Sequence, residues 1–242
     1  MIWKMKISFD GTNFFGWQIQ PEFRTVQGEI EAAISSIFDR KVSVNGSSRT
    51  DTGVHALGMI AHADFPERYE SEDLRYRLNA VLPLDIAIVE ITPSPDDFHA
   101  RFWAKGKRYE YRLVFEKIPH LRNYTHRIDR KPDIGALNAL CRDIIGDHDF
   151  TAFARIKSVP DNPKCSIRRA EWFDNDYGMA FVIDGDRFLH TMVRSIVGAM
   201  LDCERGLFAP DQFAEMLETG IRKYNYAVAP GCGLWLVEVF YD

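Results

Sequence analysis

The 242-residue sequence contains few cysteines, and they are scattered. The four (Cys141, Cys165, Cys203 and Cys232) form no Cys-x-x-Cys pair and no cluster with histidine. This spacing argues against a structural zinc site and against a dense disulfide framework. We therefore expect four reduced thiols.

Long hydrophobic runs are also absent. No stretch approaches the roughly 20 apolar residues that a membrane-spanning helix needs, and the N-terminal residues lack the apolar core of a signal peptide. The composition, 46% hydrophobic and 27% charged, is that of a globular protein. We therefore expect a cytoplasmic protein without a membrane partner.

Motifs for metal or cofactor binding are missing as well. The sequence has no glycine-rich nucleotide-binding loop, and its one concentration of potential ligands is Asp147-His148-Asp149. Three adjacent ligands without a distant fourth are weak support for a metal site. We expect neither a metal nor a cofactor.

Acidic residues outnumber basic ones, 35 to 30, but many of the basic residues are concentrated in one stretch. The chain carries a net charge of −5, whereas residues 101–131 hold ten basic and three acidic residues, a local charge of +7. Such a stretch can bind phosphates while the rest of the surface stays acidic, or it can form a solvated, salt-bridged strand pair. The candidates for substrate contact within it are Arg101, Lys107 and Arg108.

The stretch Ser47–Ala56 places one carboxylate, Asp51, between two threonines, with Arg49 before it and Gly53 after it. Apolar, strand-like residues precede and follow, so the pattern predicts a tight loop between two strands. Asp51 is either an ordinary turn residue or a catalytic group held on a rigid loop.

An aromatic cluster, Phe14-Phe15-Gly16-Trp17-Gln18, follows the first strand. It is either part of the core or a flap that stacks on bases.

Arg194 is the only basic residue in an apolar stretch, residues 188–201, that is predicted to be helical. A charge there is costly unless it is paired or reaches the surface. Either its side chain extends to solvent, or it reaches Asp51 and favours the ionised form of that carboxylate.

The periodicity along the chain predicts an α+β protein. Helices are expected from residue 25, at 71–82, 132–146, 188–201 and 211–218. Strands are expected at 5–9, on both sides of the Asp51 loop, and at 85–91, 98–102, 105–115, 167–173, 179–183 and 234–240. Strand-rich halves that each hold helices hint at an internal duplication.

Seven motifs, in order, make the chain resemble the TruA family of tRNA pseudouridine synthases. They are the opening from Asp10 to Gln18, the Arg49–His55 loop, Asp97–Phe102, Lys107–Tyr111, Asp149–Phe153, Phe188–Gly198 and Gly233–Leu236. The family usually has Gly and Ala where this chain has Ser48 and Thr52.

The resemblance implies roles for individual residues. Asp51 is implied to be the catalytic carboxylate, as nucleophile or base, and Arg194 to form an ion pair with it. Arg49 is implied to shape the loop and take part in flipping the base, and Tyr109 to stack on the uracil.

The resemblance also implies the fold and the substrate. The expected fold is of pseudouridine synthase type, with a mostly antiparallel sheet flanked by helices and two similar α/β subdomains, 1–103 and 104–242, around a central basic cleft. The implied reaction converts uridine to pseudouridine at positions 38–40 in the anticodon stem-loop of tRNA, without a cofactor, by a homodimer.

Two other functions remain open on the sequence. A non-catalytic tRNA-binding or folding protein could use the same scaffold. A carboxylate-dependent glycosidase would need a second, suitably placed acid, and no motif supplies one.

Overall fold

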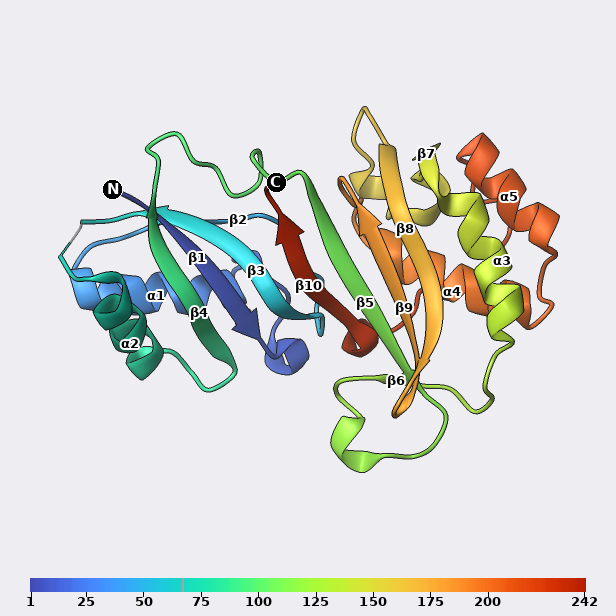
Figure 1. The fold of residues 1–242 in the computed structure, drawn as a ribbon, viewed down its shortest axis with the longest axis horizontal. Helices are drawn as coiled ribbons and strands as arrows, with labels where there is room; N and C mark the ends of the chain where they lie inside the picture. The colour runs from blue at the N-terminus through green and yellow to red at the C-terminus, as the bar shows by residue number, and fades with distance from the viewer. Residues whose placement is uncertain (67) are drawn as a thin grey trace. The chain divides into compact units, whose positions relative to one another are not determined.

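The computed structural model describes residues 1–66 and 68–242, which form two compact units (Figure 1). Unit 1 comprises residues 1–105 and 235–242, and unit 2 comprises residues 106–234. Each unit combines a largely antiparallel sheet with helices, so the predicted α+β class is confirmed. The C-terminal residues 235–242 pack with unit 1, whereas the sequence interpretation grouped all of 104–242 together.

The sheet of unit 1 has β1 at its centre, between β4 and β3. Both neighbours run antiparallel to β1. On β3, the short β2 pairs in antiparallel and β10 pairs in parallel. The strand bounds are β1 (Ile2–Phe9), β2 (Val44–Gly46), β3 (His55–Asp64), β4 (Ile86–Ser94) and β10 (Leu234–Phe240). Alternate residues of β1 are buried, as the period-two geometry of a strand requires (Trp3, Met5, Ile7 and Phe9).

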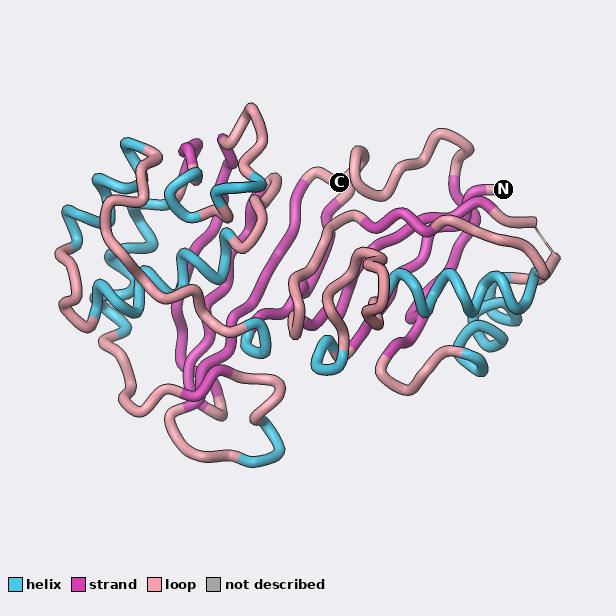
Figure 2. The backbone as a smooth tube through the Cα atoms, turned by 180° about the vertical axis from the view of Figure 1, so that it is seen from behind, coloured by secondary structure: helices cyan, strands magenta, loops and turns pink. Residues whose placement is uncertain are grey.

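Two helices cover one face of this sheet: α1 (Val26–Phe38) and α2 (Ser71–Val81). The predicted cap of α1 is present, since the Thr25 hydroxyl accepts a hydrogen bond from the Gly28 amide. The α1 side chains at helical spacing are buried (Val26, Ile30, Ala33 and Ile34). Figure 2 shows both helices from the other side of the molecule.

In the sheet of unit 2 the strand order is β5-β9-β8-β7, and each neighbouring pair is antiparallel. The short β6 pairs in parallel with β5. The bounds are β5 (Gly106–Val114), β6 (His126–Arg127), β7 (Gly146–Asp149), β8 (Lys164–Asn175) and β9 (Gly178–Gly185). The β8–β9 hairpin turns as predicted, because the Asn175 side chain accepts hydrogen bonds from the amides of Tyr177 and Gly178.

Three helices pack on the unit 2 sheet: α3 (Ile134–Ile144), α4 (Met192–Glu204) and α5 (Pro210–Thr219). Nearly every residue of α4 is buried, which explains its apolar sequence. Single turns of 3₁₀ helix occur at η1 (Gly11–Asn13), η2 (Pro119–Leu121), η3 (Thr151–Phe153), η4 (Ile156–Ser158) and η5 (Gly231–Gly233). Within the described residues, no helix combines the length and the apolar composition that crossing a bilayer requires.

Three predicted elements differ from the structure. Residues 98–102 form turns rather than a strand, because their backbone groups bond to side chains and turns instead of a neighbouring strand. Helix α4 begins at Met192 rather than at 188, because Thr191 adopts a left-handed conformation with φ 64°. Residues 146–149, predicted as helix end and loop, form strand β7 by pairing with β8.

Candidate functional site

Asp51 occupies a tight turn between β2 and β3 in unit 1. The Ser47 amide donates to the Ile60 carbonyl at 2.7 Å, and the Val54 amide closes the turn on the Asp51 carbonyl at 3.2 Å. Gly53 has φ +75°, a conformation that glycine adopts without strain. The predicted strand–loop–strand arrangement is therefore present, with the Asp51 side chain partly exposed and Arg49 exposed.

The opening segment of the chain holds this turn in place. The Trp17 amide donates to the Thr50 carbonyl at 3.1 Å, and the Gly53 amide donates to the Phe14 carbonyl at 3.3 Å. Gly16 has φ +88°, and a Cβ there would lie 2.4 Å from the Thr50 carbonyl oxygen. The two motifs, which are distant in sequence, thus form one closely packed body.

His55 anchors the end of the turn. It is fully buried, its Nδ1 accepts a hydrogen bond from the Gly11 amide at 3.0 Å, and its ring stacks on Trp235 at 4.3 Å between centroids. The sequence interpretation did not identify these supports, because Gly11 and Trp235 reach His55 only in the folded chain.

The sequence left open whether the aromatic cluster of residues 14–18 belongs to the core or forms a flap, and its side chains differ in exposure. Phe14 and Trp17 are core residues, whereas Phe15 is about half exposed. A moving flap would need the whole segment to be released, and the hydrogen bonds to the Asp51 turn tie its backbone down.

Unit 2 contains four of the predicted site residues. Tyr109 and Lys107 of β5 are buried, and the Tyr109 ring meets the Phe188 ring edge-on, with centroids 5.1 Å apart. Arg108 faces the other side of β5 and forms a two-fold hydrogen bond with Asp184, at 2.8 and 2.7 Å.

Arg194 lies in the first turns of α4 and is half buried. Its Nε donates to the Ala229 carbonyl at 2.7 Å, and the Ala229 amide donates back to the Arg194 carbonyl at 3.1 Å. The same segment is fixed by the Tyr111 hydroxyl, which donates to the Pro230 carbonyl at 2.9 Å. Burial raises the pKa of Tyr111. The guanidinium is therefore oriented by the Ala229 backbone carbonyl rather than extended freely into solvent.

Arg101 lies in an exposed turn of unit 1, which is anchored through its neighbour Ala100. The Ala100 amide donates to His62 Nδ1 at 3.1 Å, and the Tyr241 hydroxyl donates to the Ala100 carbonyl at 2.6 Å. The Arg101 guanidinium lies 6.0 Å from the Phe102 ring centre.

Much of the positive charge counted in residues 101–131 is already balanced. At least five of the ten basic residues form ion pairs: Arg108 with Asp184, Arg112 with Glu110, Arg127 with Asp129, Arg130 with Glu204 and Lys131 with Asp174. The salt-bridged alternative therefore describes a large part of this stretch.

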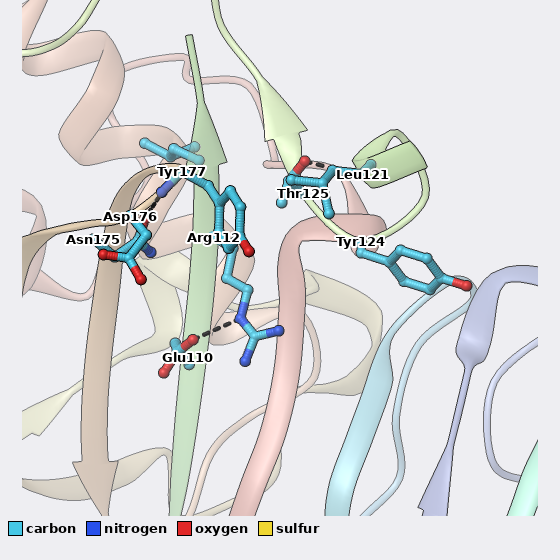
Figure 3. A pocket seen from close by; sticks show the side chains of 9 residues that line it. Glu110, Arg112, Leu121, Tyr124, Thr125, Asn175, Asp176 and Tyr177 are labelled. Atoms are coloured by element: carbon cyan, nitrogen blue, oxygen red, sulfur yellow. Dashed lines mark hydrogen bonds and ion pairs between the residues drawn. The ribbon is translucent and has the colours of Figure 1, made fainter. Parts of the chain in front are cut away.

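Unit 2 also has an open pocket of about 330 Å³, shown in Figure 3. It lies between β5, the loop after β5 and the β8–β9 hairpin, and its lining includes Glu110, Arg112, Leu121, Tyr124, Thr125 and Tyr177. Glu110 and Arg112 alternate along β5 with Tyr109 and Tyr111, so these two lining residues are on the face of the strand opposite to Tyr109. None of the predicted site residues lines it.

The structure brings Asp51 together with residues 11–17 and His55 in unit 1, and Arg194 together with Tyr111 and Ala229 in unit 2. The ion pair of Asp51 with Arg194 stays a prediction. Across residues 1–66 and 68–242, no group of three or more His, Cys, Asp or Glu side chains is placed to hold a metal ion.

Comparisons with known proteins cover nearly the whole chain. A family model described as tRNA pseudouridine synthase matches residues 5–103 and 140–242. The chain is 39% identical over 243 residues to tRNA pseudouridine synthase A of Bacillus subtilis, covering 99% of this chain and 98% of the relative. Identity is 41% over 241 residues to the enzyme of the same name from Anoxybacillus flavithermus, again covering 99% and 98%.

A third relative, tRNA pseudouridine synthase A of Listeria monocytogenes, is 36% identical over 245 residues, covering 99% of each chain. Among solved structures, a Cbf5–Nop10–Gar1 complex matches with a TM-score of 0.34 and 11% identity, covering 81% of this chain and 52% of the other.

Proposed function

Because the chain belongs to the tRNA pseudouridine synthase family, we propose that it isomerises uridine at positions 38–40 of tRNA with Asp51 as its catalytic carboxylate. The activity of the family is the conversion of uridine in tRNA to pseudouridine, so this chain is an isomerase acting on tRNA. The non-catalytic alternative gains no support, since the relatives compared above are all named as synthases.

The reaction rearranges bonds without importing a group. The bond from uracil N1 to the sugar breaks, the base turns, and C5 forms the new bond to the sugar; C5 then loses its proton and N1 takes one up, so substrate and product are isomers. An ionised carboxylate can serve either by adding to the nucleoside or by removing a sugar proton. Neither role requires a metal or a cofactor, and we propose that none is used.

One observation supports Asp51 above all: its turn is held by backbone hydrogen bonds to the opening motif. Trp17 and Gly53 each contribute one such bond, and the tight approach of Gly16 fixes the spacing. A catalytic group must be kept within a fraction of an ångström of its working position, and this packing provides that constraint.

The other residues are assigned supporting roles. We assign to Arg194, which is oriented by the Ala229 carbonyl, an ion pair with Asp51, and to Tyr109 stacking on the extruded uracil. Arg49 is to help displace the target base from its stack.

Phosphate contact is proposed for Arg101, Lys107 and Arg108. Arg101 is the most exposed of the three, whereas Lys107 is buried and Arg108 is engaged with Asp184. Arg101 is therefore expected to contribute most to the salt-dependent part of tRNA affinity.

The test is pseudouridine formation by the purified protein on unmodified tRNA tritiated at uracil C5, read as released tritium and mapped by position. Asp51→Ala is expected to lower turnover by at least about 10³-fold. Its tRNA affinity should stay within about threefold of wild type, because phosphate contacts supply much of the binding. Asp176→Ala, an exposed carboxylate in the β8–β9 hairpin, is the matched control. Substantial turnover by Asp51→Ala would refute the assignment.

The same assay tests Arg194. If it pairs with the Asp51 carboxylate, Arg194→Met should lower turnover by about 10²-fold or more, because the carboxylate loses its opposing charge. Arg205→Met, at the C-terminal end of the same helix, should keep near-wild-type turnover, and unchanged turnover for Arg194→Met would contradict the role.

The proposed homodimer rests on the family resemblance, and the proposed cytoplasmic location rests on the lack of long hydrophobic runs in the sequence. Sedimentation equilibrium should give twice the chain mass, and a monomer at micromolar concentration would contradict the dimer. Cell fractionation should place the protein with the cytoplasmic marker, and recovery elsewhere would contradict that location. Activity should persist in EDTA.

A further inference from the structure

The loop of residues 14–25 in unit 1 presents apolar side chains to solvent close to the Asp51 turn. Phe15 and Ile19 are each 46% exposed and Phe23 is 48% exposed, whereas Phe14 and Trp17 are 1% and 3% exposed. The loop thus uses two of its aromatic residues for the core and leaves two others at the surface.

Phe15 and Phe23 form a pair. Their ring centroids are 4.3 Å apart and their planes differ by 35°. The Phe15 amide donates to the Arg24 carbonyl at 2.9 Å, and the Gln20 side chain donates to the Phe15 carbonyl at 2.9 Å. The two rings are therefore held together by the backbone that carries them.

Arg24 fixes the base of this loop. Its guanidinium makes a two-fold hydrogen bond to Asp85, at 2.7 and 2.9 Å, and a third bond to Glu29 at 2.7 Å. It also lies over the Phe14 ring, 4.2 Å from the centroid. Because this loop is already ordered, a ligand that binds to it causes little further loss of conformational entropy.

The pair lies next to the proposed catalytic turn. Gly16 directly follows Phe15, and a Cβ on Gly16 would lie 3.2 Å from the Asp51 carbonyl carbon. The Trp17 amide bonds to the Thr50 carbonyl. Phe15 is thus one residue away from direct contact with the backbone of the turn.

We propose that Phe15 and Phe23 form a stacking platform for an unpaired RNA base close to the uridine being isomerised. The proposal rests on the function proposed above. Extruding one base removes a stacking partner from its neighbours, and an exposed aromatic pair can replace that partner. Stacking on an aromatic side chain does not depend on base identity, so the platform suits an enzyme whose target positions have different neighbours.

The test is a coupling measurement between protein and RNA. Binding of anticodon stem-loop RNAs is measured, each with one abasic nucleotide at a different loop position, to the Asp51→Ala protein with and without Phe15→Ala/Phe23→Ala. At one position, the abasic change should weaken binding by roughly 5- to 150-fold when the platform is intact, and by less than about twofold when it is removed. Equal losses in both proteins at every position would overturn the proposal.

Two further variants separate stacking from other causes. Phe15→Leu/Phe23→Leu keeps apolar side chains without rings, so it should lose the coupling as the alanine variant does; retained coupling would overturn stacking. Tyr76→Ala, which removes a 72% exposed aromatic ring from α2, should retain the full coupling. Circular dichroism confirms that each variant is folded.

Because the measured quantity is binding, its result is independent of turnover. If the wild type makes no pseudouridine, the proposed function fails whatever the coupling. If Asp51→Ala alone abolishes turnover and no RNA position shows coupling, only the platform fails.

Discussion

Individual glycines determine how closely the backbone segments of the proposed site approach. Gly16 combines φ +88° with a distance of 2.4 Å from its missing Cβ to the Thr50 carbonyl oxygen. A Cβ on Gly11 would lie 2.0 Å from the Val54 carbonyl oxygen. Any side chain at these positions must push the Asp51 turn away from the opening segment. The glycines are therefore required by the tertiary packing rather than by local turn geometry alone.

Gly16→Ala should destabilise the protein by about 2–4 kcal/mol, because it adds both a left-handed alanine and a backbone collision. Gly206→Ala is the matched control, since Gly206 has φ +79° but nothing within 4 Å of its missing Cβ. Its cost should be about 1–2 kcal/mol from backbone strain alone. Urea unfolding measures the loss of stability in both variants. Equal losses would contradict the prediction, because they would mean that the backbone collision at Gly16 adds nothing to the strain.

At the scale of elements, one histidine of β3, His62, contacts two neighbouring strands and the turn that carries Arg101. His62 of β3 pairs with Lys4 of β1 and with Asn45 of β2, and its Nδ1 accepts a hydrogen bond from the Ala100 amide. An accepting Nδ1 requires the neutral ring. Burial, with the neighbouring His99 adding to it, lowers the pKa of His62 from its ordinary value of 6.5. The hydrogen bond between His62 and the turn that carries Arg101 therefore forms only while His62 is uncharged.

This lowered pKa predicts a pH-dependent stability. Above pH 6.5 His62 is neutral in both the folded and the unfolded chain. As the pH falls below that value, the unfolded chain takes up the proton first, so the free energy of unfolding decreases. His62→Asn keeps an acceptor without the titration, and its unfolding free energy should fall less between about pH 7.5 and pH 5.5.

Burial lowers the pKa of His126 as well, so a reduced pH dependence remains in the His62 variant. Denaturant unfolding at both pH values measures the difference. The prediction is wrong if wild type and His62→Asn lose the same amount.

At the scale of the whole molecule, the last strand completes the first unit. Residues 235–242 belong to unit 1, and β10 pairs in parallel with β3 through Trp235 opposite His55 and Leu236 opposite Ala56. Leu236 is fully buried, and Trp235 stacks on His55 at the end of the Asp51 turn. The proposed catalytic turn thus depends on residues almost 200 positions further along the chain.

Leu236→Ala should destabilise unit 1 by about 2–5 kcal/mol, the usual cost of removing a buried leucine. Val237→Ala, on the less buried side of the same strand, should cost about 1 kcal/mol or less. Hydrogen exchange should show faster exchange of the β1 and β3 amides in Leu236→Ala. Unchanged protection of those strands would mean that unit 1 does not need β10.

The sequence alone predicted those features that arise from interactions between near neighbours. The α1 helix follows from the Thr25 cap and the spacing of Val26, Ile30 and Ile34, and the β8–β9 turn from Asn175 and Gly178. The Arg49–His55 motif likewise pointed to the family without reference to the fold, because the reaction requires particular side chains at a particular spacing.

Tertiary structure alone decided which side chains within those motifs face the core, a charge partner or solvent. It buried Phe14 and Trp17 but exposed Phe15, and it paired Arg108 with Asp184, 76 residues away. It also placed residues 235–242, which contain most of β10, in unit 1, and it made residues 98–102 a turn. Each of these outcomes depends on contacts between residues far apart in the chain, and the free energy of such contacts exceeds the local preferences that a sequence pattern reports.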